Sequence, residues 1–118
     1  MQKSVLIVED EFLIAMDLQA MLEDHGWRVL GPAANVRDAL RVLADELPTV
    51  ALLDVNLGNE LVTEVAVKLK ANDVPFAVAT AYVNAEQFGG AVLAGAPNVG
   101  KPIAERRLLA TLELLTQH

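Results

Sequence analysis

The fold is decided by the stretch Val50-Ala51-Leu52-Leu53-Asp54-Val55-Asn56-Leu57-Gly58. Its first four residues are apolar without alternation, which is typical of a parallel strand covered on both faces. Asp54 stands at the carboxyl end of this predicted strand, directly before a loop that contains Gly58. A buried strand has little reason to end on a charge unless that charge meets a partner, and the carboxyl edge of a parallel sheet is where ligands bind. The stretch therefore predicts an α/β protein with a site at Asp54.

The composition fits one folded domain. The chain has 118 residues, of which 53% are hydrophobic and 21% charged, as in ordinary globular domains. Its net charge of -7 argues against direct binding to nucleic acid or to an anionic membrane. No apolar run approaches the roughly 18 residues of a membrane span, and residues 1–10 lack the layout of a secretory signal peptide. Because there is also no cysteine, we expect a cytoplasmic protein without disulfides.

Short apolar runs alternate with amphipathic segments along the whole chain. The predicted strands are the Val50 stretch and residues 4–8, 27–30, 75–79 and 97–100. Apolar residues at helical spacing predict helices over 14–22, 36–47, 62–69, 84–95 and 108–115. Asn35 is expected to cap the second helix, and Gly26 to end the first. A strand followed by a helix, five times over with short connections, predicts a parallel sheet with helices on both faces.

Polar residues follow four of the predicted strands: Glu9, Asp10, Asp54, Thr80 and Lys101. In a doubly wound sheet these strand ends converge on one crevice. Three carboxylates together would repel one another unless a cation lay among them, and an all-oxygen ligand set, partly through water, suits Mg²⁺. Asn56 could add its backbone carbonyl. The sequence therefore predicts a magnesium site at this edge of the sheet.

The same edge is suited to phosphoryl chemistry. A metal ion, the Lys101 ammonium and the Thr80 hydroxyl are the groups that stabilise charge on a phosphoryl group in transfer. A carboxylate held beside a metal can act as a nucleophile, which makes Asp54 the expected acceptor, giving an aspartyl phosphate. No Gly-rich phosphate loop is present, so a bound nucleotide is not expected.

Four motifs carry a resemblance to a known family: VLIVEDE at 5–11, ALLDVNLG at 51–58, ATAY at 79–82 and KP at 101–102. Together they resemble the CheY-like receiver domain of bacterial two-component response regulators, over essentially the whole chain. The run PFAVATAY at 75–82 further resembles single-domain alphaproteobacterial receivers with a Phe-Ala-Thr-Gly-type motif, although Ala81 stands where that subgroup usually has Gly. The resemblance implies one receiver domain over 1–118 without an output domain. It also implies a flavodoxin-like (βα)5 sheet of five parallel strands in the order 2-1-3-4-5.

The resemblance also implies a role for each polar residue. Asp54 would be the phosphoacceptor and, together with Asp10 and the Asn56 carbonyl, a direct ligand of Mg²⁺, with Mn²⁺ as an alternative. Glu9 would act through a water molecule. Thr80 would move toward the phosphoryl group and Lys101 would pair with it. The Lys101–Pro102 peptide bond would be cis.

Two positions depart from the family pattern. Many receivers carry Tyr or Phe three residues before the lysine, and this ring moves on activation; here the residue is Asn98. Many also carry Phe after the Lys-Pro pair, where this chain has Ile103. Tyr82 is a candidate substitute for the missing aromatic switch.

The expected function is that of a stand-alone response regulator. A sensor histidine kinase would phosphorylate Asp54, and the face formed by the fourth helix, the fifth strand and the last helix would change its affinity for a downstream protein. The chain would otherwise act as a phosphate sink, and phosphorylation could also create a homodimer. It would catalyse only its own phosphorylation and dephosphorylation.

Three alternatives use the same fold. The first is an interaction module that works without phosphorylation, against which the complete set of site residues argues. The second is an aspartate-based phosphohydrolase, but Asn56 stands where such an enzyme needs a general acid. The third is a flavin-binding protein, against which the acidic first strand end and the few aromatic residues argue.

Overall fold

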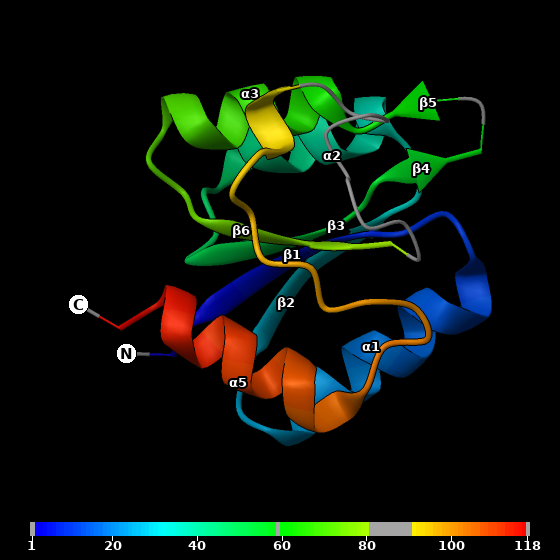
Figure 1. The fold of residues 1–118 in the computed structure, drawn as a ribbon, viewed down its shortest axis with the longest axis vertical. Coiled ribbons are helices and arrows are strands. Elements are labelled where there is room, and N and C mark those ends of the chain that lie inside the picture. Colours follow the sequence, from blue (N-terminus) through cyan, green and yellow to red (C-terminus); the bar gives the residue numbers. More distant parts are fainter. Residues whose placement is uncertain (1, 59, 81–90, 118) are drawn as a thin grey trace.

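The four strands of the main sheet alternate with helices along the chain, as the sequence predicts. The computed structural model describes residues 2–58, 60–80 and 91–117. Its strands are β1 (Ser4–Val8), β2 (Arg28–Ala33), β3 (Val50–Asp54), β4 (Asn56–Leu57), β5 (Glu60–Leu61) and β6 (Phe76–Ala79). Its helices are α1 (Phe12–Asp24), α2 (Val36–Asp45), α3 (Thr63–Ala71), the 3₁₀ helix η1 (Ala91–Leu93) and α5 (Glu105–Leu115). Figure 1 shows these elements as three layers, with the sheet in the middle.

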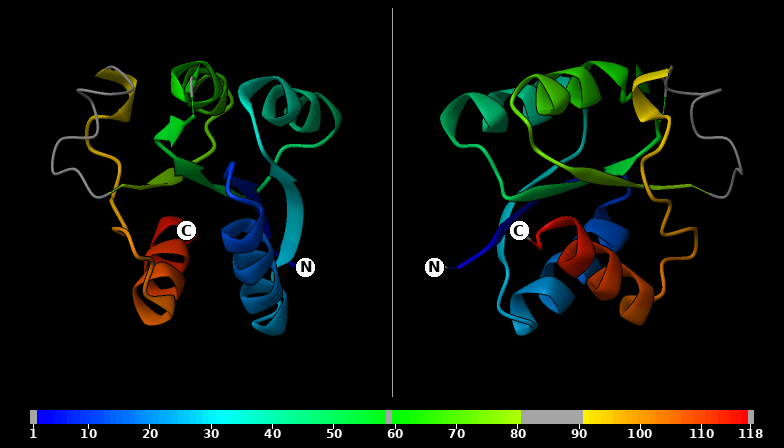
Figure 2. Two further views of the ribbon diagram at one scale, coloured as in Figure 1. Left: turned by 90° about the vertical axis from the view of Figure 1, so that its right-hand side faces the viewer. Right: turned by 60° about the vertical axis from the view of Figure 1, so that its left-hand side comes forward.

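The sheet has the order β2-β1-β3-β6, and all three pairings are parallel. Helices α2 and α3 cover one face, and α1 and α5 cover the other (Figure 2). This arrangement confirms the predicted doubly wound α/β architecture. Every residue of β1 and β3 is buried, because these two strands lie inside the sheet and are covered on both sides.

Successive side chains of each inner strand pack into two separate hydrophobic cores, one on each face of the sheet. In β3, Ala51 and Leu53 pack toward α2 and α3, whereas Val50 and Leu52 pack toward α1 and α5. Successive side chains of a strand point to opposite faces, so a strand with two covered faces needs apolar residues at every position. This explains why the run from Val50 shows no alternation and why the first charged residue comes at its end.

The predicted helix ends are also confirmed. Asn35 Oδ1 accepts a hydrogen bond of 2.8 Å from the backbone N–H of Asp38, which satisfies one of the free donors in the first turn of α2. Gly26 follows the end of α1 with φ of +87°, a conformation that glycine adopts without penalty. Trp27 comes next and is buried in the core on the α1 side.

Two strands differ from the prediction. The second strand is not confined to 27–30 but runs through Gly31 and Pro32, because β1 and β2 continue to pair after a shift in register, with Val8 opposite Ala33. The predicted fifth strand over 97–100 is reduced to one parallel bridge between Val78 and Asn98. The expected five-strand order therefore appears as four strands with a bridge at the β6 edge.

Two further segments differ from the prediction or lie outside the description. The antiparallel pair β4–β5 directly after β3 was not predicted, because its two strands are too short to show periodicity. Of the predicted helix over 84–95, residues 84–90 lie outside the described residues and Ala91–Leu93 form η1. Across residues 2–58, 60–80 and 91–117, no helix has both the length and the apolar character needed to cross a membrane.

Two leucines of α5 test the assignment of the core. Leu112 is fully buried, whereas Leu114, two residues further along the same helix, is 69% exposed. We expect Leu112→Ala to lower the free energy of unfolding by about 2–5 kcal/mol, because it leaves a cavity between α5 and the sheet. Leu114→Ala is the matched control and should change it by less than about 0.5 kcal/mol. Urea denaturation of both variants measures the difference, and equal losses would contradict this packing.

Candidate functional site

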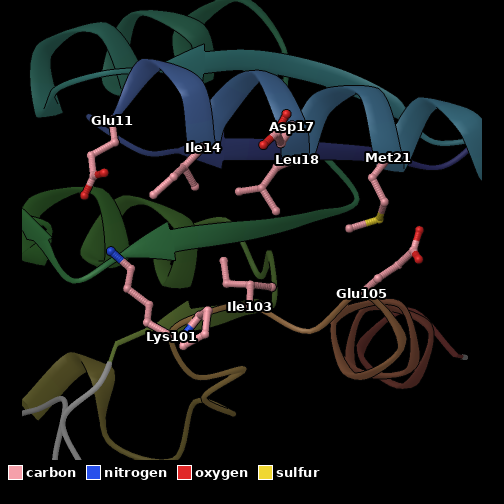
Figure 3. Close-up of a pocket in the computed structure, with 9 residues that line it drawn as sticks. Glu11, Ile14, Asp17, Leu18, Met21, Lys101, Ile103 and Glu105 are labelled. Atoms are coloured by element: carbon pink, nitrogen blue, oxygen red, sulfur yellow. The ribbon is translucent and has the colours of Figure 1, made fainter.

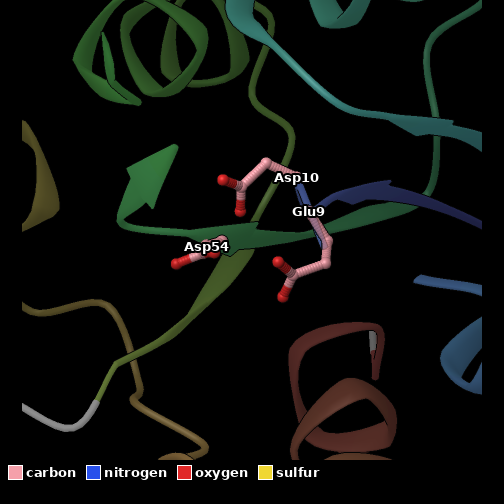
Figure 4. A group of neighbouring side chains, drawn as sticks. All are labelled: Glu9, Asp10 and Asp54. Carbon is pink, nitrogen blue, oxygen red and sulfur yellow. The ribbon is translucent and has the colours of Figure 1, made fainter. Parts of the chain in front are cut away.

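The polar strand ends converge at one edge of the sheet. Val8 lies opposite Leu53, and Asp54 lies opposite Ala79, so the residues that follow β1 and β6 flank the end of β3. Carboxylate oxygens of Glu9, Asp10 and Asp54 all lie within 4.8 Å of one another. Figure 4 shows the three acids at the ends of adjacent strands. The structure thus brings together the acids that the sequence predicted would converge.

Two of these acids are buried, where their negative charges repel each other and need a compensating partner. Glu9 is 3% exposed and Asp54 is 4% exposed, whereas Asp10 is exposed. Lys101 Nζ lies 3.0 Å from Asp54 Oδ2 and 3.8 Å from Glu9 Oε1. Glu9 Oε2 also accepts a hydrogen bond of 3.1 Å from the backbone N–H of Glu11. One ammonium therefore faces two buried carboxylates, with a third carboxylate nearby.

The charge balance shifts two ionisation equilibria. The pKa of Glu9 is raised to about 7. Burial is the largest cause, the negative charge of Asp54 and a hydrogen bond to it add to the rise, and the Glu11 N–H and the Lys101 ammonium oppose it. Burial alone would lower the pKa of Lys101, but its hydrogen bond to Asp54 and the surrounding negative charges outweigh this, so the pKa is raised. Lys101 consequently stays protonated.

The donor set fits a hard divalent cation. Glu9, Asp10 and Asp54 offer only oxygen atoms, the ligands that Mg²⁺ and Mn²⁺ prefer. A cation among them would also relieve the repulsion between the carboxylates. Asn56 begins β4 two residues after Asp54, and Gly58 turns the chain back with φ of +64°. A side chain at Gly58 would begin 3.6 Å from Asp10 Oδ2, so this turn backs directly onto the acids.

Thr80 lies at the same edge, and the Asn98 side chain holds its backbone. The sequence marked Asn98 only as the position where many receivers carry Tyr or Phe. Thr80 is buried, and Asn98 bonds both of its backbone groups: Oδ1 accepts from Thr80 N–H at 3.2 Å and Nδ2 donates to Thr80 C=O at 3.2 Å. The available signal was the spacing Asn98-Val99-Gly100, because an Asn two residues before a Gly commonly forms a turn.

The two remaining predicted residues contribute differently. The Lys101–Pro102 bond is cis, as the resemblance implied. Tyr82, the candidate substitute for the aromatic switch, lies outside the described residues.

Beside Lys101 a cavity of about 430 Å³ opens between α1 and the start of α5 (Figure 3). Its lining combines the apolar side chains Ile14, Leu18, Met21 and Ile103 with Lys101 and the acids Glu11, Asp17 and Glu105.

Comparison with known proteins shows which family the chain belongs to. The family model described as the response regulator receiver domain matches residues 5–113. The chain belongs to this family. The match covers all three strand ends that carry the acids and Thr80, and also Lys101.

Individual relatives show how widely the receiver domain is used. The transcriptional regulatory protein PdtaR of Mycobacterium tuberculosis is 32% identical over 117 residues, covering 95% of this chain and 56% of that protein. The chemotaxis protein CheY4 of Vibrio cholerae superposes with a TM-score of 0.83 at 27% identity, covering 98% of this chain and 99% of that one. The anti-anti-sigma factor PhyR of Bartonella quintana gives a TM-score of 0.76 at 28% identity, with 98% of this chain and 47% of that one covered. The chain thus spans about half the length of PdtaR and of PhyR, and the three names describe different outputs.

Asp10 offers a test of the metal site in this receiver. Asp10→Asn removes one negative charge next to two buried carboxylates, so we expect the metal-free protein to gain about 1 kcal/mol in the free energy of unfolding. The same change removes a ligand, so the added stability that Mg²⁺ gives the wild type should be lost. Thermal unfolding with Mg²⁺ and with a chelator measures both effects. Asp17→Asn, at an exposed site on α1, is the control and should keep the Mg²⁺ response; a response retained by Asp10→Asn would contradict the site.

Glu9 should make the metal-free stability depend on pH. Folding raises the pKa of Glu9 from 4.5 to about 7, so the folded chain binds the proton more tightly than the unfolded chain. The stability contributed by this proton is fully present below pH 4.5 and is lost as the pH rises through about 7. Relative to Glu9→Gln, the wild type should lose about 1–3 kcal/mol across this window. Urea denaturation with chelator at several pH values measures it, with Glu64→Gln as an exposed control; a difference that does not vary with pH would contradict the shift.

Proposed function

We propose that this receiver domain accepts a phosphoryl group on Asp54 from a sensor histidine kinase, in a reaction that depends on Mg²⁺. The single observation that carries the proposal is the buried Asp54 carboxylate, 3.0 Å from the Lys101 ammonium and grouped with Glu9 and Asp10. A structural ion pair would need one acid for one lysine. Two additional acids at the same point have a use if a cation and a phosphoryl group bind there.

The reaction follows from the placement of these groups. An Asp54 carboxylate oxygen attacks phosphorus while the P–N bond to the donor imidazole breaks and its electron pair returns to the ring nitrogen. A Mg²⁺ ion at this site would supply positive charge that stabilises the phosphoryl oxygens. Asp10, Asp54 and the Asn56 carbonyl would hold the cation, and Glu9 would hold it through water. The protein thereby lowers the barrier mainly by positioning and by electrostatic stabilisation.

Lys101 and Thr80 respond to the new charge. Before transfer Lys101 pairs with Asp54 Oδ2; afterwards the phosphoryl oxygens carry more negative charge, so the ammonium moves to them. The Thr80 hydroxyl donates to another phosphoryl oxygen. These two displacements begin directly after β6 and on the segment before α5, so they change the surface of the molecule on that side.

The output is the control of a protein partner. The surface that changes comprises α5, the segment over 97–100 and the predicted fourth helix, whose residues 84–90 lie outside the described residues. The domain would pass the signal by binding a downstream protein, by forming a homodimer or by serving as a phosphate sink for its kinase. That its relatives include an anti-anti-sigma factor supports a protein as the partner.

A small phosphodonor tests the proposal directly. Incubation with acetyl phosphate and Mg²⁺ should add one phosphoryl group, detected by intact-mass spectrometry, and Asp54→Asn should abolish the gain because the nucleophile is lost. Asp45→Asn changes an exposed acid on α2 and should be labelled like the wild type. Chelation of Mg²⁺ should prevent labelling. An unlabelled wild type, or labelling that persists in Asp54→Asn, would contradict the proposal.

A further inference from the structure

The Asn98 side chain contacts two segments at once, the one that carries Thr80 and the one that leads to Lys101. Its amide bonds the N–H and the C=O of Thr80. Its Oδ1 also accepts a hydrogen bond of 2.8 Å from the N–H of Gly100, directly before Lys101. One side chain is thus connected to both strand-end segments that carry the phosphoryl-facing residues.

The bonds from Asn98 to Thr80 continue the sheet beyond the last backbone-to-backbone bonds of β6, with a side chain in place of a backbone partner. Val78 donates its N–H to Pro97 C=O, and Val99 donates its N–H to Val78 C=O, each at 2.9 Å. In a parallel ladder the next rung would use the N–H and the C=O of the residue two further along, which is Thr80. The Asn98 amide bonds these same two groups. It therefore fixes the backbone of Thr80 as a further rung would.

The bond to Gly100 has a separate consequence for Lys101. Gly100 has φ of +79°, so the chain turns away from β6 at this residue. The Asn98 oxygen accepting from the N–H two residues later is the usual way in which Asn stabilises such a turn. Lys101 follows the turn, and its ammonium lies 3.0 Å from Asp54 Oδ2. The turn therefore sets where the Lys101 side chain begins.

The chemistry of the side chain suits this double task. A carboxamide presents one acceptor and one donor in a single plane, which allows it to bond an N–H and a C=O of the same residue. The aromatic ring that many receivers carry at this position has no such pair. Asn98 is also anchored from α5, because Arg107 Nη2 donates to its backbone carbonyl at 2.8 Å.

We propose that Asn98 is a positioning residue for phosphoryl transfer to Asp54, whose amide holds the Thr80 backbone so that the Thr80 hydroxyl meets the phosphoryl group. This inference rests on the proposed function of Asp54. Asn98 acts through Thr80 and does not itself touch the phosphoryl group. Small misplacements of a group that must meet a reacting atom cost up to about 100-fold in rate.

Asn98→Ser separates the two connections. A serine hydroxyl can still accept from Gly100 N–H and keep the turn before Lys101, but it is too short to bond both groups of Thr80. At saturating Mg²⁺ we expect Asn98→Ser to slow labelling by acetyl phosphate about tenfold. Because the metal-binding acids follow β1 and end β3, the concentration of Mg²⁺ needed for half-maximal rate should not change.

A double-mutant cycle with Thr80→Ala distinguishes positioning from general loosening of the fold. If Asn98 acts by placing the Thr80 hydroxyl, Asn98→Ser should slow a chain that already carries Thr80→Ala by less than about twofold. A purely structural role would slow both backgrounds equally, and that additive result would overturn the inference. Should Asn98→Ser fail to fold by circular dichroism, the same cycle is run with the isosteric Asn98→Asp, which loses the donor to Thr80 C=O.

The outcomes also separate this inference from the proposed function. An unlabelled wild type, or an Asp54→Asn variant that is labelled, would remove the proposed function and the inference with it. A wild type labelled only on Asp54, together with Asn98→Ser labelled at the same rate, would overturn the inference alone. A slowed Asn98→Ser whose defect disappears in the Thr80→Ala background supports it.

Discussion

The structure depends on negative charge that is buried at the carboxyl edge of a parallel sheet and only partly compensated. Glu9 and Asp54 are almost fully buried, and Lys101 is the ammonium that faces both. Burying a carboxylate is unfavourable unless a charge or a hydrogen bond repays it. The buried carboxylates therefore destabilise the metal-free fold, and a divalent cation bound among them would remove this destabilisation. The same buried charge is what the proposed phosphoryl chemistry uses.

The rest of the fold keeps this edge in place. Apolar side chains on both faces of β1 and β3 form the two cores, and the parallel register sets Asp54 beside the ends of β1 and β6. The short turn through Gly58 closes the site on one side, and the Asn98 amide fixes Thr80 on the other. The acids thus lie at the ends of the two inner strands β1 and β3, while the groups expected to move lie on the segments that follow β6.

The features that could be predicted from sequence are those that depend on local pattern. The uniform apolar run before Asp54 predicted a strand with two covered faces, and the acid at its end predicted the site. The position of Asn35 directly before an amphipathic segment predicted that its side chain caps α2. The single bridge at Asn98, the extension of β2 through Pro32 and the β4–β5 pair depend on register and turns between segments, which local periodicity does not encode. The sequence shows at Asn98 only that the usual aromatic residue is absent, because the bonds of Asn98 to Thr80 join residues 18 positions apart.

We infer that the acids that follow β1 share one cation with Asp54 at the end of β3, and that an Asp54 carboxylate oxygen forms the bond to phosphorus. A crystal structure of the protein with Mg²⁺ and beryllofluoride, a mimic of the phosphoryl group, would show both. We expect a beryllium–oxygen bond at Asp54, Mg²⁺ ligated by Asp10 and Asp54, and Lys101 Nζ in contact with a fluoride. Beryllofluoride bound at another residue, or Mg²⁺ bound away from these acids, would contradict it.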